Sequence, residues 1–152
     1  MALAEDRHEG GTAPIADDSG DLCDTLASGP AVIDGLRPRV LVVEDDPFIA
    51  IDMEDAFTAA GFDVVGPFAR PEPAIAATLA NPPDVATLDY RLCDGTSQTV
   101  AQALDRVDVP VIMVTGSEAE MRERETFADR EVFAKPCDID SLIARTRELA
   151  CT

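Results

Sequence analysis

The chain has 152 residues, of which 46% are hydrophobic, with few aromatics, no Trp and a formal net charge of −18. This length accommodates one domain with some residues to spare, and the hydrophobic fraction is normal for a globular protein. The acidic charge argues against nucleic-acid binding, which requires a basic surface to displace counterions from phosphates.

Residues 1–37 differ in composition from the rest, and we expect an acidic, largely flexible N-terminal extension ahead of a domain over residues 38–152. Two short apolar pieces, 22–26 and 31–36, could each dock on the domain as a turn of helix. The polar N-terminus does not resemble a signal peptide, and no apolar stretch approaches the roughly 20 residues of a membrane span. Four cysteines lack the spacing of zinc ligands, so we expect a cytoplasmic protein with reduced thiols.

From Arg39 onward, short apolar runs alternate with amphipathic stretches. Continuous apolar runs, as opposed to alternating ones, are typical of parallel strands buried on both faces of a sheet. Five strands are predicted, at Val40–Val43, Asp63–Val65, Val85–Leu88, Val109–Val114 and Glu131–Ala134.

The segments between these runs carry helix signals. The first helix has Asp46 as N-cap, Pro47 at its first position and Gly61 at its end. The later helices are predicted over 71–80, over 97–104, after a Ser117 cap, and after an Asp138 cap. Five β–α units predict an α/β fold with a doubly wound, five-stranded parallel sheet.

Polar side chains follow four of the five strands. Glu44 and Asp45 end the first strand, Asp89 the third, Thr115 the fourth and Lys135 the fifth. In doubly wound folds the carboxyl ends of the strands meet and carry the chemistry, so these side chains should converge. An acid at a strand end is more often a helix cap, but this series after four separate strands indicates a site.

The residue types indicate phosphoryl chemistry at a metal. Converging carboxylates repel one another unless a cation lies among them, and a few oxygen ligands suit a Mg²⁺ ion that keeps several waters. Asp89, on the central strand, could form an acyl phosphate. Lys135 is the only lysine and could contact a phosphoryl oxygen as a compact cation. The Thr115 hydroxyl could donate a hydrogen bond to the same group.

Residues 39–150 resemble the receiver domain of response regulators, the CheY-like, flavodoxin-type fold of two-component signalling. The matched motifs are Val42-Val43-Glu44-Asp45-Asp46-Pro47, Leu88-Asp89-Tyr90-Arg91-Leu92-Cys93-Asp94-Gly95, Val114-Thr115-Gly116 and Lys135-Pro136. The resemblance implies a strand order of 2-1-3-4-5.

The resemblance also implies a role for each matched residue. Asp89 is the phosphoacceptor, and Glu44 and Asp45 form the acidic pair. Asp45 and Asp89 bind Mg²⁺ together with the main-chain oxygen of Arg91, while Glu44 acts through water. Thr115 is the switch hydroxyl, Lys135 contacts the phosphate, and the Lys135–Pro136 peptide is cis. Asp46 is left as a helix cap.

The chain departs from the family pattern at Val132, where receivers usually have an aromatic switch residue. Phe133 comes one position later and therefore faces the other side of its strand. We therefore expect phosphorylation to change the last two β–α units less than, or differently from, a receiver with the usual aromatic. Residues 95–97 and 114–116 are similar to a variant receiver group in alphaproteobacterial stress signalling, although residues 117–118 lack that group's aromatic.

These features predict a single-domain response regulator that accepts a phosphoryl group on Asp89 from a histidine kinase or histidine phosphotransfer protein. It would catalyse its own phosphorylation and dephosphorylation, without turnover of an external substrate. Its output would be protein–protein contact, phosphorelay or phosphate-sink behaviour, with no nucleic-acid or membrane partner. Phe48 and Ile51 lie outside the buried stripe of the first helix and could face the kinase or, alternatively, pack under the extension or the last helix.

Two other function classes remain open. A pseudo-receiver would keep the fold and signal without phosphorylation, and the altered switch position favours it. A phosphatase of the haloacid-dehalogenase type also uses an Asp nucleophile. That reading is opposed by Tyr90-Arg91 after Asp89, since no acid follows two residues on.

Overall fold

The computed structural model describes residues 37–151, so the predictions for residues 1–36, an extension with two docking pieces, lie outside the described residues. Five parallel strands form one sheet in the spatial order β2-β1-β3-β6-β7. Numbered along the chain, this is the predicted order 2-1-3-4-5, and the doubly wound fold is confirmed. The strands are β1 (Arg39–Val43), β2 (Asp63–Phe68), β3 (Val85–Leu88), β6 (Val111–Thr115) and β7 (Glu131–Ala134).

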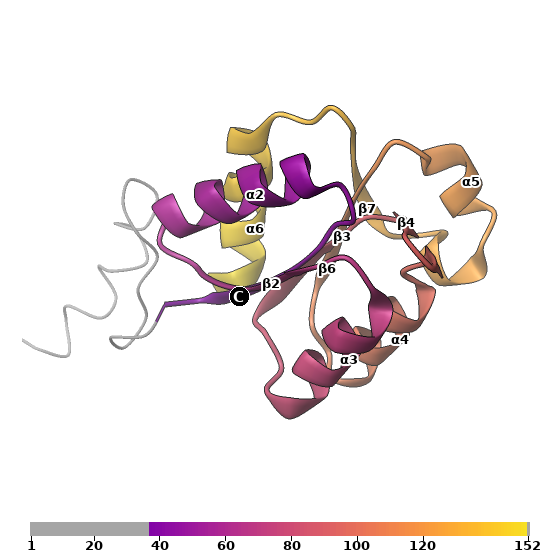
Figure 1. The fold of residues 1–152 in the computed structure, drawn as a ribbon, viewed down its shortest axis with the longest axis horizontal. Coiled ribbons are helices and arrows are strands. Elements are labelled where there is room, and N and C mark those ends of the chain that lie inside the picture. Colours follow the sequence, from indigo (N-terminus) through magenta and orange to yellow (C-terminus); the bar gives the residue numbers. More distant parts are fainter. Residues whose placement is uncertain (1–36, 152) are drawn as a thin grey trace, which may run out of the picture.

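Helices cover both faces of the sheet (Figure 1). One face is covered by α2 (Pro47–Ala59) and α6 (Ile139–Cys151). The other is covered by α3 (Pro71–Ala80), α4 (Gln98–Arg106), α5 (Glu118–Arg122) and the 3₁₀ helix η1 (Glu125–Phe127). No helix among residues 37–151 is both long enough and apolar enough to cross a membrane.

The alternation of side chains along each strand divides the core into two clusters. In β1, Val40 and Val42 pack with Met53 and Phe57 of α2, whereas Leu41 and Val43 pack in the cluster on the opposite face. Successive side chains of a strand point to opposite faces, so a strand covered on both sides requires apolar residues at every position. This explains the continuous apolar runs in the sequence.

Four predicted strand boundaries were wrong, two of them by a single residue, because backbone pairing decides where a strand begins and ends. The strand predicted to begin at Val109 begins at Val111, since the Val109 N–H donates to Leu104 O (3.0 Å) and closes the preceding helix. β2 extends beyond Val65 to Phe68, which lies opposite Val43 after an irregularity in the ladder.

Three further elements differ from the predictions. A small hairpin, β4 (Arg91–Leu92) and β5 (Gly95–Thr96), lies between β3 and α4 and was not predicted. Helix α4 is shifted toward the C-terminus relative to the predicted 97–104. Helix α5 is a single short turn, and within residues 37–151 the Ser117 side chain makes no capping hydrogen bond.

The two acidic caps are confirmed. The Asp46 carboxylate accepts hydrogen bonds from the N–H groups of Phe48 (2.9 Å) and Ile49 (3.3 Å) at the start of α2. The Asp138 carboxylate accepts from the N–H (3.2 Å) and hydroxyl (2.6 Å) of Ser141 at the start of α6. Each cap satisfies amide groups that have no partner inside the helix.

Candidate functional site

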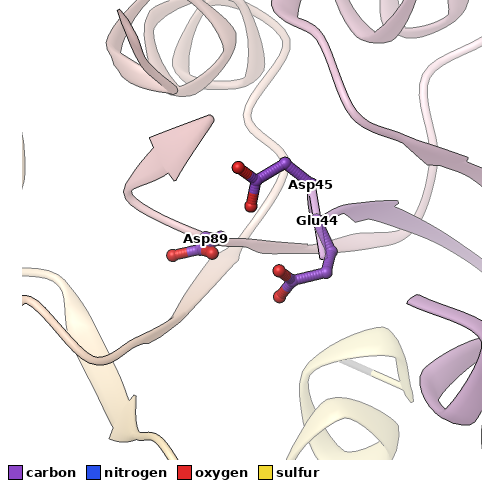
Figure 2. Close-up of side chains that lie close together, drawn as sticks. All are labelled: Glu44, Asp45 and Asp89. Carbon is purple, nitrogen blue, oxygen red and sulfur yellow. The ribbon is translucent and has the colours of Figure 1, made fainter. Parts of the chain in front are cut away.

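Three acidic side chains converge at the carboxyl edge of the sheet. Glu44 and Asp45 follow β1 and Asp89 follows β3, and these strands are neighbours with Val43 opposite Leu88. One carboxylate oxygen from each of the three lies within 4.8 Å of the other two. Figure 2 shows the three carboxylates coming from these two strand ends. The convergence predicted from the sequence is therefore present in the fold.

Lys135 connects two of these acids. Its Nζ lies 2.7 Å from Glu44 Oε1 and 2.8 Å from Asp89 Oδ2. The Glu44 side chain is 1% exposed and the Asp89 side chain 9%. Buried carboxylates are costly unless they are paired, so the ammonium group compensates much of the charge that the fold concentrates here.

Burial and hydrogen bonding have opposite effects on the pKa values of Glu44 and Lys135. Burial raises the pKa of Glu44 to about 7, although hydrogen bonds from Lys135 and from the Asp46 N–H act to lower it. For Lys135, burial by itself lowers the pKa, but hydrogen bonds to Asp89 and Glu44 outweigh it and raise the pKa. Lys135 is thus held as a cation by the two carboxylates that it contacts.

The donor set fits a small divalent cation. Mg²⁺ binds oxygen ligands at 2.0–2.1 Å in an octahedron, so two ligands on opposite sides lie about 4.2 Å apart. The carboxylate oxygens of Asp45 and Asp89 lie within 4.8 Å of each other, so they need only small side-chain movements to reach such spacing, and a Glu44 oxygen lies within the same distance of both. Asp45 is more exposed than the other two acids, which leaves one side of the cluster open to solvent.

Thr115 lies at the end of β6, the strand that pairs with β3. It is 1% exposed, and its Oγ1 accepts a hydrogen bond from the Ser117 N–H (3.1 Å). A threonine hydroxyl both accepts and donates, so this bond leaves its hydrogen for a second partner. The hydroxyl therefore joins the site to the first residues that lead into α5.

The register of β7 decides which way the residues before Lys135 face. Val132 lies opposite Met113 and packs in the cluster under α4, α5 and η1. Phe133 lies opposite Val114 and packs against the α2 and α6 side. Thr115 and Val132 thus share a face of the sheet, while the Phe133 ring lies on the other.

The rim of the site carries two ion pairs that the sequence analysis missed. Arg70 Nη2 lies 2.8 Å from Asp94 Oδ2, and Arg91 pairs with Glu120 of α5. Their partners lie far apart in the sequence, so no local pattern could reveal them. Both pairs are largely exposed, and exposed pairs contribute little to stability. The role predicted for the main-chain oxygen of Arg91 stays a prediction. The Lys135–Pro136 peptide is cis, as the resemblance implied.

A groove with a volume of about 780 Å³ opens beside the site, between α2 and the segment that joins β7 to α6. Its lining includes apolar residues of α2 and Lys135 itself. Along the same helix, the Phe48 side chain is 79% exposed and Ile51 is 54% exposed. Large apolar side chains this exposed next to a groove are a candidate contact surface.

Comparison with known proteins agrees with the sequence pattern. A family model for the response regulator receiver domain matches residues 40–147. The chain is 30% identical over 104 residues to the phyllosphere-induced regulator PhyR of Methylorubrum extorquens, covering 66% of this chain and 39% of PhyR. It is 32% identical over 120 residues to the DNA-binding dual master transcriptional regulator RpaA of Synechocystis, covering 74% of this chain and 48% of RpaA. The chain thus spans less than half the length of these relatives.

Among solved structures, the chain is similar to the receiver domain of the PhyR response regulator from Erythrobacter litoralis. The TM-score is 0.64 at 26% identity, and the match covers 82% of this chain and 92% of that domain.

Proposed function

The chain belongs to the response regulator receiver domain family, and from this premise we propose that Asp89 accepts a phosphoryl group from a histidine kinase or histidine phosphotransfer protein. The observation that supports this most directly is the set of groups around Asp89. Two acids lie within 4.8 Å of its carboxylate, and a lysine ammonium lies 2.8 Å from it. A carboxylate at the end of a central strand, flanked by a metal-binding acid pair and a cation, is suited to act as a nucleophile toward phosphorus.

In the proposed reaction a carboxylate oxygen of Asp89 forms a bond to phosphorus. The bond between phosphorus and the donor breaks, and its electron pair stays with the donor. Mg²⁺ held by Asp45 and Asp89 would neutralise charge on the phosphoryl oxygens. Lys135, now between Glu44 and Asp89, would move one of its hydrogen bonds to a phosphoryl oxygen. The Thr115 hydroxyl would donate to another.

Glu44 has a supporting role in this proposal. Its Oε2 accepts a hydrogen bond from the Asp46 N–H (3.1 Å), while its Oε1 holds Lys135. These two bonds fix the orientation of the carboxylate. We assign Glu44 a role through water, beside the Mg²⁺ that Asp45 and Asp89 would hold.

The groove beside α2 suits the approach of the phosphoryl donor. Lys135 lines both the groove and the phosphorylation site, so a helix seated in the groove would bring its histidine toward Asp89. Phe48 and Ile51 would supply exposed apolar area at the rim. We therefore propose that the partner presents a histidine-bearing helix to this surface.

The output we propose is protein–protein contact, with phosphorelay or phosphate-sink behaviour as forms of it. The name of RpaA refers to DNA binding, but this chain has a formal net charge of −18, which opposes contact of its own residues with the DNA backbone. The similarity to PhyR, which one solved structure describes as a stress response regulator, supports a place in bacterial stress signalling.

Intact-protein mass spectrometry tests the assignment. After incubation with Mg²⁺ and acetyl phosphate, the chain should gain the mass of one phosphoryl group, and Asp89→Asn should gain none. Asp63→Asn is the matched control, because Asp63 is an exposed acid at the opposite end of a strand in the same sheet. Equal labelling of Asp89→Asn would overturn the assignment, and a chain that takes no label but still binds its partner would be a pseudo-receiver.

A further inference from the structure

The residue after the proposed phosphoacceptor carries a buried aromatic ring. Tyr90 is 0% exposed and packs in the cluster on the α3, α4 and η1 face of the sheet. Its ring meets the ring of Phe127 edge-on, with centroids 5.3 Å apart and an interplanar angle of 89°. Phe127 lies in η1, which follows α5. One side chain therefore links the backbone of Asp89 directly to the α5–η1 segment.

The Tyr90 hydroxyl is not held in place by the protein. Within residues 37–151 it is buried and makes no hydrogen bond to a protein group. A buried hydroxyl without a partner is unfavourable, so a rearrangement that brings a donor or acceptor to it is favoured. The backbone of Tyr90, by contrast, is fixed at the start of α4, because its carbonyl accepts a hydrogen bond from the Ser97 N–H (2.9 Å). The ring is thus the part of this residue that is free to change partners.

The α5–η1 segment also has a direct connection to the site. The Ser117 N–H that leads into α5 is bonded to Thr115 Oγ1. If Thr115 turns to a phosphoryl oxygen, this bond changes and the segment after it shifts. Met121 of α5 and Phe127 of η1 are both fully buried in the cluster that contains Tyr90. In a close-packed cluster the segment can shift only together with the Tyr90 ring, so the ring pair controls how far it responds.

No other aromatic pair is available on this face in residues 37–151. Val132 packs in the same cluster but is aliphatic, and Phe133 faces α2 and α6. The second ring pair, Phe57 with Phe62, lies on the α2 side.

We propose that the Tyr90–Phe127 ring pair transmits a change at Asp89 to the α5–η1 segment and thereby to the surface that this segment presents. The proposal rests on the proposed function, since Asp89 is taken as the phosphorylated residue. It differs from the usual aromatic switch at the position of Val132 in β7, because the ring that moves belongs to Tyr90, the residue directly after Asp89.

The sequence offers a specific probe. Tyr90 is the only tyrosine and the chain has no tryptophan, so tyrosine fluorescence reports on this ring alone. The full chain would be measured with Mg²⁺, with and without beryllofluoride, a phosphoryl mimic. Fluorine NMR would show bound beryllofluoride independently. We expect binding to change the tyrosine emission and to alter amide exchange around Glu125–Phe127 by about fivefold or more.

Phe127→Leu removes one ring of the pair. It should still bind beryllofluoride, but the exchange response around η1 should be lost. Phe62→Leu is the matched control, since it makes the same substitution in the edge-on pair of the opposite face, where centroids are also 5.3 Å apart. It should keep the response. If Phe127→Leu does not fold, Tyr90→Leu removes the other ring and should abolish the same response.

The outcomes separate this proposal from the proposed function. Bound beryllofluoride with unchanged tyrosine emission and exchange in the unmodified chain would overturn the ring-pair proposal alone. A full response in Phe127→Leu would overturn it as well. A chain that binds no beryllofluoride would contradict the proposed phosphorylation of Asp89, and the ring-pair proposal with it.

Discussion

Gly66, in β2, occupies a position that should not tolerate a side chain. Its φ is +104°, and an added Cβ would lie 2.8 Å from Val42 O and 2.9 Å from Phe68 N. Both atoms belong to the backbone, so neither can move away as the end of a flexible side chain would. We therefore expect Gly66→Ala to destabilise the domain by strain and by close contact together.

The size of the effect follows from these two terms. A non-glycine residue in this backbone region costs about 1–3 kcal/mol, and overpacking against fixed atoms costs about 1–3 kcal/mol. The reduced entropy of the unfolded chain offsets about 0.4–1 kcal/mol. We expect a net loss of about 3 kcal/mol in the free energy of unfolding. Urea unfolding followed by circular dichroism measures this directly.

Gly95→Ala separates the two terms. Gly95 has φ +130°, but an added Cβ there meets no atom of the described residues within 4 Å. This variant should lose only the part that comes from backbone strain, about 1–2 kcal/mol after the same entropic offset. If Gly66→Ala lost no more stability than Gly95→Ala, the close approach of Val42 and Phe68 would not matter energetically.

Gly66→Ala should also affect the site. The carbonyl of Phe68 accepts a hydrogen bond from the Glu44 N–H (2.8 Å), and the ladder between β1 and β2 is irregular at this point. A backbone shift at Gly66 would therefore reach the acidic pair. Mg²⁺ affinity of the folded variant, measured by calorimetry, should be lower than that of the unmodified chain.

Two further predictions concern the metal and the partner. Asp45→Ala should weaken Mg²⁺ binding at least about tenfold, since loss of a ligand costs no less than loss of a supporting residue; Asp46→Ala should instead cost about 0.5–2 kcal/mol as a lost helix cap. Calorimetric titration of both variants measures their Mg²⁺ affinities. A larger drop in affinity in Asp46→Ala than in Asp45→Ala would show that the metal ligand is Asp46, one residue later than assigned. Phe48→Ala and Ile51→Ala should each slow phosphotransfer from the partner about fivefold or more while acetyl phosphate still labels the chain. Leu79 is an exposed residue of α3 on the opposite face of the sheet, so Leu79→Ala is the control and should leave phosphotransfer unchanged. If an α2 variant lost both phosphotransfer and acetyl-phosphate labelling, that variant would have a folding defect.

Much of the fold was predictable because its signals are local. The continuous apolar runs, the Asp46–Pro47 helix start and the Asp138 cap each depend on neighbouring residues, and all three predictions are confirmed. The order of acids, hydroxyl and lysine after successive strands also predicted which side chains would meet. Parallel strands connected by helices bring their carboxyl ends to one edge, so the strand pattern alone was enough for this inference.

The unpredicted features lie within short stretches of the chain but leave no periodic pattern in the sequence. The β4–β5 hairpin has only two residues in each strand, too few for a periodic pattern. The start of β6 was set by the bond from Val109 to Leu104, which removes Val109 from the strand. Neither feature has a signature within a short stretch of sequence.

The sequence by itself therefore determined the fold class, the family and the set of residues at the strand ends, because periodicity, caps and motif spacing are properties of neighbouring positions. Only the tertiary structure decided how those residues interact. It placed Lys135 between Glu44 and Asp89, and it set the Tyr90 ring against Phe127, residues separated along the chain by an entire β–α unit. Such contacts arise from the packing of elements against one another, where burial and complementary shape select partners that sequence proximity does not specify.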